Sequence, residues 1–464
     1  MPRMHVVGNA HIDPIWLWRW SEGQQVIRST FLSQVRLLKQ RQDYVFCASS
    51  ASFYKVIELT DPTLFEEIRR MIREGRWEVV GGWWVEPDCN LPSGEALARH
   101  SLYGQRYFSS KFGLKAKVGY SVDSFGHNAM IPQILKRSGI DHYVFMRPGQ
   151  HEKELPFWAF RWRSPDGSTV IAHRIPTYIA AVRTLKSLIE TMISEMKSPV
   201  DVLLLLMGQG DHGGGPTIQD ILEIDRLGRE TTSVQFGFSP IEGYFGEISN
   251  VEGHLPLVAE ELQHHASGCY SALSRIKQLN RKTEEALIAA EKLNFMASML
   301  SGMEYHGTEF YRAWTNLLFC QFHDVLAGSC IREAYEFDVF PMLEEALSIA
   351  NRISDLSTQS MASKIRIHKD KSIIVFNPNA FAVRYPVEVN WIWQEHPESL
   401  SDGMGGRVQC QIGEASALSQ GISSLVFVVD IPPLGYNVFE PLAANQVDDR
   451  GENLIVGQFS LENR

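Results

Sequence analysis

A histidine and an aspartate two residues apart, His11 and Asp13, follow the apolar run MHVVG near the start of the chain. Residues i and i+2 of an extended segment point to the same side, so an imidazole nitrogen and a carboxylate oxygen can bind one cation together. The segment continues into Pro14, Trp16 and Trp18. A rigid aromatic wall beside a carboxylate is typical of a sugar-binding surface, so this stretch predicts two metal ligands next to a stacking face.

The same His-x-Asp spacing recurs at His368 and Asp370, in the polar stretch RIHKDKS. A solvated strand end explains this second pair, so the spacing alone is not specific for a metal. The first pair differs because it follows a core strand and precedes proline and tryptophan.

Three further groups of acidic or histidine residues follow apolar or helical runs. Asp123 lies in YSVDSFGHN, where a helix cap is the alternative role. Asp211 and His212 lie in GQGDHGGGP, which lacks the Gly-Lys-Ser/Thr of a P-loop but could let an acidic side chain move over a substrate. His323 and Asp324 lie in CQFHDVLAG, where a packed core histidine is the alternative. Two carboxylates in separate loops and a His/Asp metal set are what glycosidic cleavage needs.

The elements that must position these residues alternate in type from residue 1 to about residue 260. Short apolar runs such as MHVVGNA, YVFCAS and WEVVGGWWV are separated by charged helical stretches such as LFEEIRRMIREGR, which predicts β-α-β units and a parallel sheet with helices on its faces. The run LLLLM has no alternation, as expected of a strand buried on both faces. Ligands of parallel α/β folds bind at the carboxyl ends of the strands, so we expect the chemistry there.

Two further regions have different patterns. Apolar residues at helical spacing over 271–300, in EFYRAWTNLLFCQF and in REAYEFDVFPMLEEALSIANRI, predict a three-helix bundle. From about residue 370, runs such as LVFVVDIPPLGYNVF are bounded by Pro, Gly and Asn and predict strands. We therefore expect a catalytic α/β domain over 1–262, a helical bundle over 263–356, and over 357–464 a β-rich region that looks incomplete.

Composition narrows the classes of partner and location. The chain has 464 residues and a formal net charge of −10, without a run of Lys or Arg, so nucleic acid and anionic lipid are disfavoured partners. It contains no apolar run of the roughly 18 residues that a membrane span needs, and no signal-like start, so the expected location is the cytoplasm. The six cysteines are far apart and lack a C-x-x-C pair, which favours reduced thiols.

Five motifs, in this order, resemble those of the class II α-mannosidases, glycoside hydrolase family 38. They span residues 5 to 330 and read AHIDPIWLW, GGWWVEPDCNLPSGE, VDSFGHN, GQGDHGGGPT and FHDVLAGS. The resemblance implies a fold of the α/β class: a seven-stranded parallel β/α barrel, followed by a three-helix bundle and the start of a β-sandwich region. It also implies one divalent cation, commonly zinc.

The resemblance assigns roles to residues of the quoted motifs. The implied metal ligands are His11, Asp13, Asp123 and His323. Asp123 is also the implied nucleophile, and Asp211 the general acid and then base. The loop of Asp211 resembles the bacterial and vacuolar branch, and His212, Glu86 or Asp88 are the alternatives for the acid. The implied substrate-binding residues are Trp16, Arg147 and Asp324.

The predicted function is a metal-dependent retaining α-mannosidase, which hydrolyses terminal α-linked mannose through a covalent mannosyl-aspartate. The expected substrate is a mannose-containing oligosaccharide or a small mannoside. Two alternatives stay open: a barrel hydrolase of the sugar-deacetylase type that uses a metal-bound water, and a carbohydrate-binding protein without catalysis. The sequence does not determine the oligomeric state, so a homo-oligomer is an open alternative.

Overall fold

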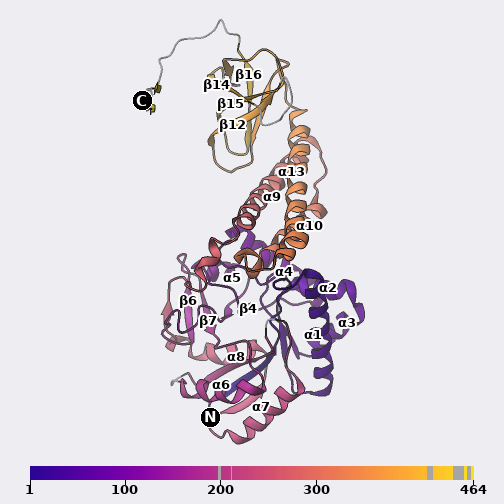
Figure 1. Ribbon diagram of the computed structural model, residues 1–464, viewed down its shortest axis with the longest axis vertical. Helices are drawn as coiled ribbons and strands as arrows, with labels where there is room; N and C mark the ends of the chain where they lie inside the picture. The colour runs from indigo at the N-terminus through magenta and orange to yellow at the C-terminus, as the bar shows by residue number, and fades with distance from the viewer. Residues whose placement is uncertain (197–199, 211, 415–421, 443–453, 457–460, 464) are drawn as a thin grey trace. The chain divides into compact units, whose positions relative to one another are not determined.

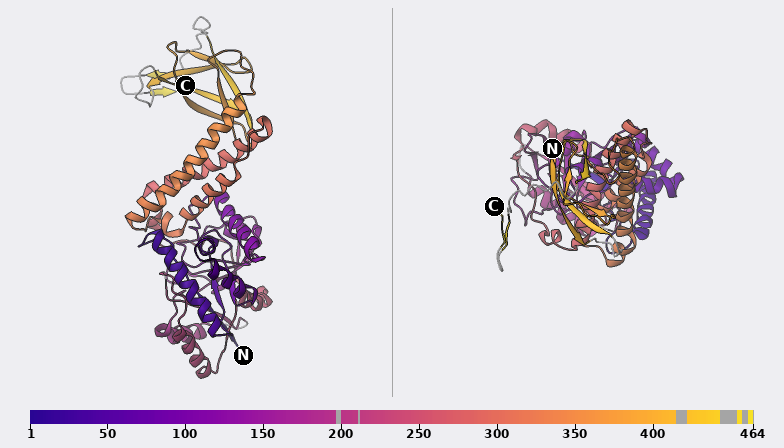
Figure 2. Two further views of the ribbon diagram at one scale, coloured as in Figure 1. Left: turned by 90° about the vertical axis from the view of Figure 1, so that its right-hand side faces the viewer. Right: turned by 90° about the horizontal axis from the view of Figure 1, so that it is seen from above.

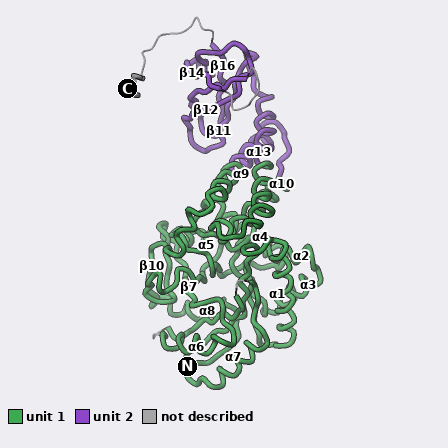
Figure 3. The backbone as a smooth tube through the Cα atoms, in the orientation of Figure 1, with its two compact units in different colours: residues 1–287, 307–349 green, residues 288–306, 350–464 purple. Residues whose placement is uncertain are grey.

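The computed structural model describes residues 1–464 except 197–199, 211, 415–421, 443–453, 457–460 and 464. The chain divides into two compact units, coloured in Figure 3. Unit 1 contains residues 1–287 and 307–349, and unit 2 contains residues 288–306 and 350–464. The division into domains at residues 262 and 356 stays a prediction.

The first sheet of unit 1 is built around β1 and is entirely parallel. Its strands are β1 (Arg3–Asn9), β2 (Phe46–Ala48), β3 (Trp77–Val79), β8 (Val202–Met207) and β9 (Gln235–Phe238). Every residue of β8 is buried, because its run of apolar residues is covered on both faces. The predicted parallel sheet is confirmed.

The second sheet of unit 1 has the order β10-β6-β7-β5-β4. Its strands are β4 (Val118–Ser121), β5 (His142–Phe145), β6 (Ala159–Arg163), β7 (Thr169–Arg174) and β10 (Leu257–Val258). β4, β5 and β7 are parallel, and β6 is antiparallel to β7. Main-chain pairs link the two sheets: the N–H of Gly81 donates to Val118 at 2.8 Å, and Ala180 pairs with Gly208.

Helices cover the outside of these sheets. They are α1 (Trp20–Gln40), α2 (Ala51–Thr60), α3 (Pro62–Arg73), α4 (Gly94–Phe112), α5 (Ile131–Arg137), α6 (Val182–Ser194) and α7 (Ile218–Glu230), whereas α8 (Ile241–Ile248) does not belong to this outer layer. Figure 1 shows α1 to one side of the strands, and the turned view in Figure 2 shows it in front of them. Helix α4 begins where Ser93 accepts the N–H of Ala96, directly after the GGWWVEPDCN loop.

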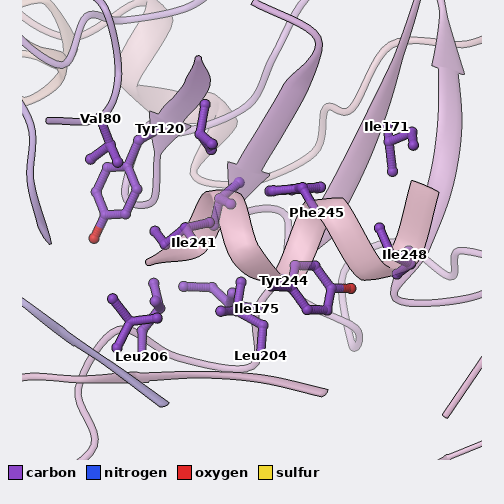
Figure 4. Close-up of a cluster of buried hydrophobic side chains, with 14 of the residues drawn as sticks. Val80, Tyr120, Ile171, Ile175, Leu204, Leu206, Ile241, Tyr244, Phe245 and Ile248 are labelled. Carbon is purple, nitrogen blue, oxygen red and sulfur yellow. The ribbon is translucent and has the colours of Figure 1, made fainter. Parts of the chain in front are cut away.

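Helix α8 differs from the other helices because it lies among the strands. Its buried residues Ile241, Tyr244, Phe245 and Ile248 belong to one cluster with side chains of both sheets. Figure 4 shows Leu204 and Leu206 of β8 on one side of this helix, and Val80 and Tyr120 on the other. The cluster also contains residues of β1, β2, β5 and β7, namely Val7, Cys47, Val144 and Ile171.

The helical region lies where the sequence predicts it. Its helices are α9 (Ser274–Ser301), α10 (Gly307–Cys320), α11 (His323–Ala327), α12 (Arg332–Ala334) and α13 (Phe340–Ala362). Within unit 1, Arg275 lies 3.3 Å from Glu344, and Asn316 donates to Glu345 at 2.8 Å. No helix of the described residues is both long enough and apolar enough to cross a membrane.

Unit 2 contains the predicted β-rich region as a nearly closed antiparallel sheet of order β11-β16-β13-β14-β15-β12. Its strands are β11 (Ile373–Asn377), β12 (Val383–Trp391), β13 (Ser399–Ser401), β14 (Arg407–Glu414), β15 (Ser423–Ile431) and β16 (Gly435–Pro441), and a separate pair is β17 (Leu454–Val456) and β18 (Leu461–Asn463). Trp391, Phe427 and Phe439 pack in its core. His368 and Asp370 are exposed ahead of β11, as a solvated segment should be. All six cysteines of the chain are free.

Candidate active site

The loop after β1 presents His11 and Asp13 at the carboxyl end of the sheet. The Nε2 atom of His11 lies 3.0 Å from Oδ1 of Asp13, and both side chains are 2 % exposed. The indole N–H of Trp18 donates to the main-chain oxygen of Asp13 at 2.9 Å, which fixes the path of the loop.

Helix α11 supplies the third member of the cluster, His323, which is fully buried. Its Nε2 atom lies 3.8 Å from Oδ1 of Asp13, and its ring stacks on that of His11 with 5.4 Å between centroids. Ligand atoms of His11, Asp13 and His323 all lie within 4.8 Å of one another. The structure therefore brings together residues that are more than 300 positions apart.

These three residues fit a cation because their facing atoms are otherwise unpaired. Nε2 of His11, Oδ1 of Asp13 and Nε2 of His323 are buried, and outside this cluster none has a hydrogen-bond partner in the described part of the chain. A buried polar atom without a partner is destabilising, typically by about 1–3 kcal/mol. Two imidazole nitrogens and a carboxylate are ligands that zinc prefers. A divalent cation is the group that would satisfy all three atoms at once.

Asp123 lies beside this cluster, just beyond the end of β4. Its Oδ2 atom is 3.7 Å from Nε2 of His11 and accepts a hydrogen bond from the hydroxyl of Tyr178 at 3.0 Å. Its other oxygen, Oδ1, is paired with Nε of Arg147. A carboxylate that a guanidinium and a hydroxyl hold in place has a fixed orientation.

Burial and crowded charges shift several pKa values at the site. Burial by itself lowers the pKa of His11, but the carboxylates of Glu86 and Asp13 outweigh it and raise this pKa well above 6.5. Burial raises the pKa of Asp13 to about 6, against the opposing effect of His11. Burial, with Asp13 nearby, raises the pKa of Asp324 well above its usual range. A cation would offset this crowding of buried acids.

The predicted substrate-binding residues Trp16 and Asp324 flank the cluster. Trp16 is half-buried, its ring is edge-on to Trp18 at 5.7 Å, and its main-chain oxygen accepts the N–H of Ile331. Asp324 is buried, its Oδ2 lies 3.6 Å from Nε2 of His323, and Ser329 donates to its Oδ1 at 2.6 Å. Arg147, the third of them, is held by Asp123.

The predicted general acid, Asp211, lies outside the described residues. Its neighbour His212 is exposed and stacks on the indole of Trp18, with ring centroids 4.1 Å apart and planes within 10°. His212 also pairs through its main chain with Ile12, so the loop after β8 lies against the loop after β1.

Two residues beside Asp123 have contacts that the sequence does not predict. Tyr178 is in no recognisable motif, and nothing in the sequence indicates its contact with Asp123. Glu86 is predicted only as an alternative acid, but it lies 3.2 Å from His11. The other alternative, Asp88, accepts the N–H groups of Asn90 and Leu91 at 2.8 Å each, which stabilises the loop.

Comparison with known families identifies the class of the protein. The chain belongs to glycosyl hydrolase family 38: residues 1–264 match the N-terminal domain of that family, and residues 264–361 match the α-mannosidase middle domain. It is 32% identical over 389 residues to "Alpha-mannosidase" of Saccharomyces cerevisiae, and this match covers 78% of this chain and 35% of the relative. It is 30% identical to human "Alpha-mannosidase 2C1", over 72% of this chain and 32% of that protein.

Solved structures show the same fold. The crystal structure of an alpha-mannosidase from Enterococcus faecalis V583 matches with a TM-score of 0.79 at 18% identity, over 99% of this chain and 59% of that one. A 4-alpha-glucanotransferase from Thermococcus litoralis matches with a TM-score of 0.53 at 12% identity, over 95% of this chain and 100% of that one. The chain spans about a third of the length of the curated relatives it matches.

Proposed function

We propose that this chain carries the catalytic site of a metal-dependent retaining α-mannosidase, which hydrolyses terminal α-linked mannose. The observation that carries the proposal is the convergence of three buried ligand atoms, from His11, Asp13 and His323, next to the carboxylate of Asp123. None of the three atoms has a hydrogen-bond partner outside this cluster among the described residues. Membership of glycosyl hydrolase family 38 and relatives named α-mannosidase support it.

We propose that His11, Asp13, Asp123 and His323 hold one divalent cation, with zinc as the first candidate because of the nitrogen and oxygen donors. When bound, the cation would favour the ionised form of Asp123 and bind neighbouring hydroxyls of the sugar.

In the proposed mechanism Asp123 is the nucleophile. Arg147 and Tyr178 hold its carboxylate, and one oxygen forms a bond to the anomeric carbon while the bond to the leaving oxygen breaks. Asp211 gives its proton to that oxygen, then takes one from the water that cleaves the mannosyl-aspartate. This role for Asp211 rests on its motif position, and retention predicts a separation of about 5–5.5 Å between the two carboxyl groups.

We propose Trp16, Arg147 and Asp324 as the residues around the bound sugar, which is part of a mannose-containing oligosaccharide or a small mannoside. Trp16 offers the partly exposed aromatic face that the C–H surface of a sugar can contact. Nucleic acid and membranes are not among the proposed partners, the proposed location is the cytoplasm, and a homo-oligomer is an open alternative.

We also propose that the two sheets of unit 1 form one seven-stranded barrel in the order β1-β2-β3-β4-β5-β7-β8. The main-chain pairs Gly81–Val118 and Ala180–Gly208 at the sheet edges support this closure. The cluster of core residues around α8 also supports it, because this cluster contains side chains from strands of both sheets. The three-helix bundle of α9, α10 and α13, and a β-sandwich that starts in the β-rich region, remain part of the proposal.

Hydrolysis of a chromogenic aryl α-mannoside, with and without a metal chelator, tests the function. We expect hydrolysis that the chelator abolishes and zinc restores, and a loss of kcat by a factor of about 10³ or more in Asp123→Asn. His368→Ala, in the exposed second His-x-Asp pair, is the matched control and should keep wild-type activity. Hydrolysis that a chelator leaves unchanged would contradict the metal role. Release of acetate from an acetylated sugar would favour the deacetylase alternative. Binding of a sugar without turnover would favour the carbohydrate-binding protein.

A further inference from the structure

Glu86 lies behind the proposed metal ligands, on the side away from the cluster. It is 2 % exposed, and its Oε2 atom is 3.2 Å from Nδ1 of His11, whereas Nε2 of the same ring faces Asp13. Its Oε1 atom accepts the main-chain N–H of Asp123 at 2.8 Å. Its main-chain oxygen is 3.3 Å from Nδ1 of His323. One residue therefore contacts three of the four proposed ligands.

The loop that carries Glu86 is held in this position by its own main chain. The N–H of Glu86 donates to the hydroxyl of Ser50 at 3.2 Å, and the N–H of Asp88 donates to the oxygen of Gln321 at 2.9 Å. Pro87 also pairs with Phe322, the residue before His323. These contacts set the register between the loop of Glu86 and the start of α11.

The same contacts argue against the role of general acid for Glu86. One carboxylate oxygen is bonded to the main chain of Asp123, and the other faces the buried ring of His11. A general acid must reach the leaving oxygen of the substrate, which lies on the opposite side of the anomeric carbon from the nucleophile's attack. Glu86 is behind the nucleophile, so its position fits support of the ligands.

We propose that Glu86 is a positioning residue that orients the metal ligands. A neutral imidazole carries one N–H, and an acceptor at Nδ1 leaves the lone pair of Nε2 free for a cation. The carboxylate of Glu86, 3.2 Å from Nδ1 of His11, is placed to be this acceptor for His11, and its main-chain oxygen is placed to be the acceptor for His323. Its bond to the N–H of Asp123 places the nucleophile in the same arrangement. This inference rests on the proposed function.

The number of acceptors makes the proposal testable by substitution. A glutamate has two acceptor oxygens, and here one serves the N–H of Asp123 while the other faces His11. Glutamine has a single acceptor oxygen, so Glu86→Gln must give up one of the two contacts. Glu86→Asp keeps both oxygens but withdraws them by one methylene. Asp88→Asn, two residues along the same loop, is the matched control because the side chain of Asp88 accepts the N–H groups of Asn90 and Leu91 within its own loop.

The experiment measures the zinc dissociation constant of the whole chain by competition with a chelating dye, the visible spectrum of the Co²⁺-substituted protein, and thermal unfolding in EDTA. We expect Glu86→Gln to raise the dissociation constant about 10- to 100-fold and to change the Co²⁺ spectrum. Glu86→Asp should show a smaller rise, and Asp88→Asn none. Thermal unfolding of the metal-free proteins separates a loss of zinc affinity from a general loss of stability.

Two results would overturn the inference. One is a wild-type dissociation constant and Co²⁺ spectrum in Glu86→Gln. The other is an earlier unfolding in EDTA with an unchanged zinc affinity, which is the result of a purely structural role. If Glu86→Gln does not fold, an unchanged affinity and spectrum in Glu86→Asp overturns it instead. If the wild-type protein does not bind zinc, the proposed function is contradicted. This result comes from the wild type alone, so it can be distinguished from a failure of the Glu86 inference, which is measured in the variants.

Discussion

Asp123 receives a donor on each of its carboxylate oxygens, Arg147 on one and Tyr178 on the other. Arg147 places a positive charge directly against this buried carboxylate. Tyr178 adds a neutral donor, and its ring also packs against His11 with 4.7 Å between centroids. The orientation of the Asp123 carboxylate, the proposed nucleophile, therefore depends on side chains from two loops other than its own.

Replacement of Tyr178 by phenylalanine removes the hydroxyl and keeps the ring. A hydrogen bond to a charged group contributes about 1.5–3 kcal/mol, so Tyr178→Phe should lower kcat for an aryl α-mannoside about 10- to 100-fold. Zinc affinity should stay near wild type because His11 keeps its aromatic neighbour. Tyr107→Phe is the control, since the hydroxyl of the buried Tyr107 donates to the carboxylate of Glu58 at 3.0 Å, between helices α4 and α2. Equal kcat values in Tyr178→Phe and wild type would show that the bond does not matter for turnover.

Helix α1 and the loop before it are packed together at a glycine. Gly23 lies in the first turn of α1, and a Cβ atom there would overlap the main-chain oxygen of Pro14, next to Asp13. The missing side chain therefore lets the helix approach the loop that carries two proposed ligands. At the scale of elements, the position of the metal site depends on how closely α1 packs.

Substitution of Gly23 by alanine should disturb both stability and the site. Overpacking of this kind costs about 1–3 kcal/mol, so the free energy of unfolding in urea should fall by that amount. The zinc dissociation constant should rise, because the displaced loop carries His11 and Asp13. Gly246→Ala in α8 is the control: Gly246 is exposed and an added Cβ would meet nothing within 4 Å. That control should gain about 0.5–1 kcal/mol. A Gly23→Ala protein as stable as the control would refute the close approach.

Buried histidines outside the proposed metal cluster make the stability of the protein depend on pH. Burial lowers the pKa of His100, His127 and His173 to about 3 each. In the unfolded chain the pKa of a histidine is about 6.5. Between these two values the unfolded chain binds protons that the folded chain does not. The stability from these neutral histidines is thus present above pH 6.5 and is lost as the pH falls toward 3.

The effect can be measured by substitution of one of them. Each such histidine contributes a slope of about 1.4 kcal/mol per pH unit to the free energy of unfolding. His173, whose Nδ1 is 2.8 Å from the hydroxyl of Tyr244, is the clearest case because burial is the sole cause of its shift. The free energy of unfolding is measured by urea titration with EDTA present, between pH 6 and 4. In His173→Gln it should fall less steeply with decreasing pH than in the wild type, by about 1.4 kcal/mol per pH unit. Parallel curves for the two proteins would mean that His173 is charged in the folded state.

The sequence determined the order and type of the elements and part of the site. Apolar runs such as LLLLM predicted buried parallel strands, and the residues after them predicted where polar side chains gather. The pair His11 and Asp13 could be predicted as two ligands because an extended segment fixes which side chains share a face. These properties are local, and the spacing of a few residues is enough to set them.

Only the tertiary structure decided which distant groups meet. The approach of His323 to His11 depends on the path of the chain between the sheet and α11, and no spacing encodes it. The contacts of Glu86 and Tyr178 depend likewise on loops that are braced by main-chain pairs with other segments. A sequence shows which side chains could bind or donate, whereas distances between loops are set by packing of the whole unit, and those distances decide which of them do.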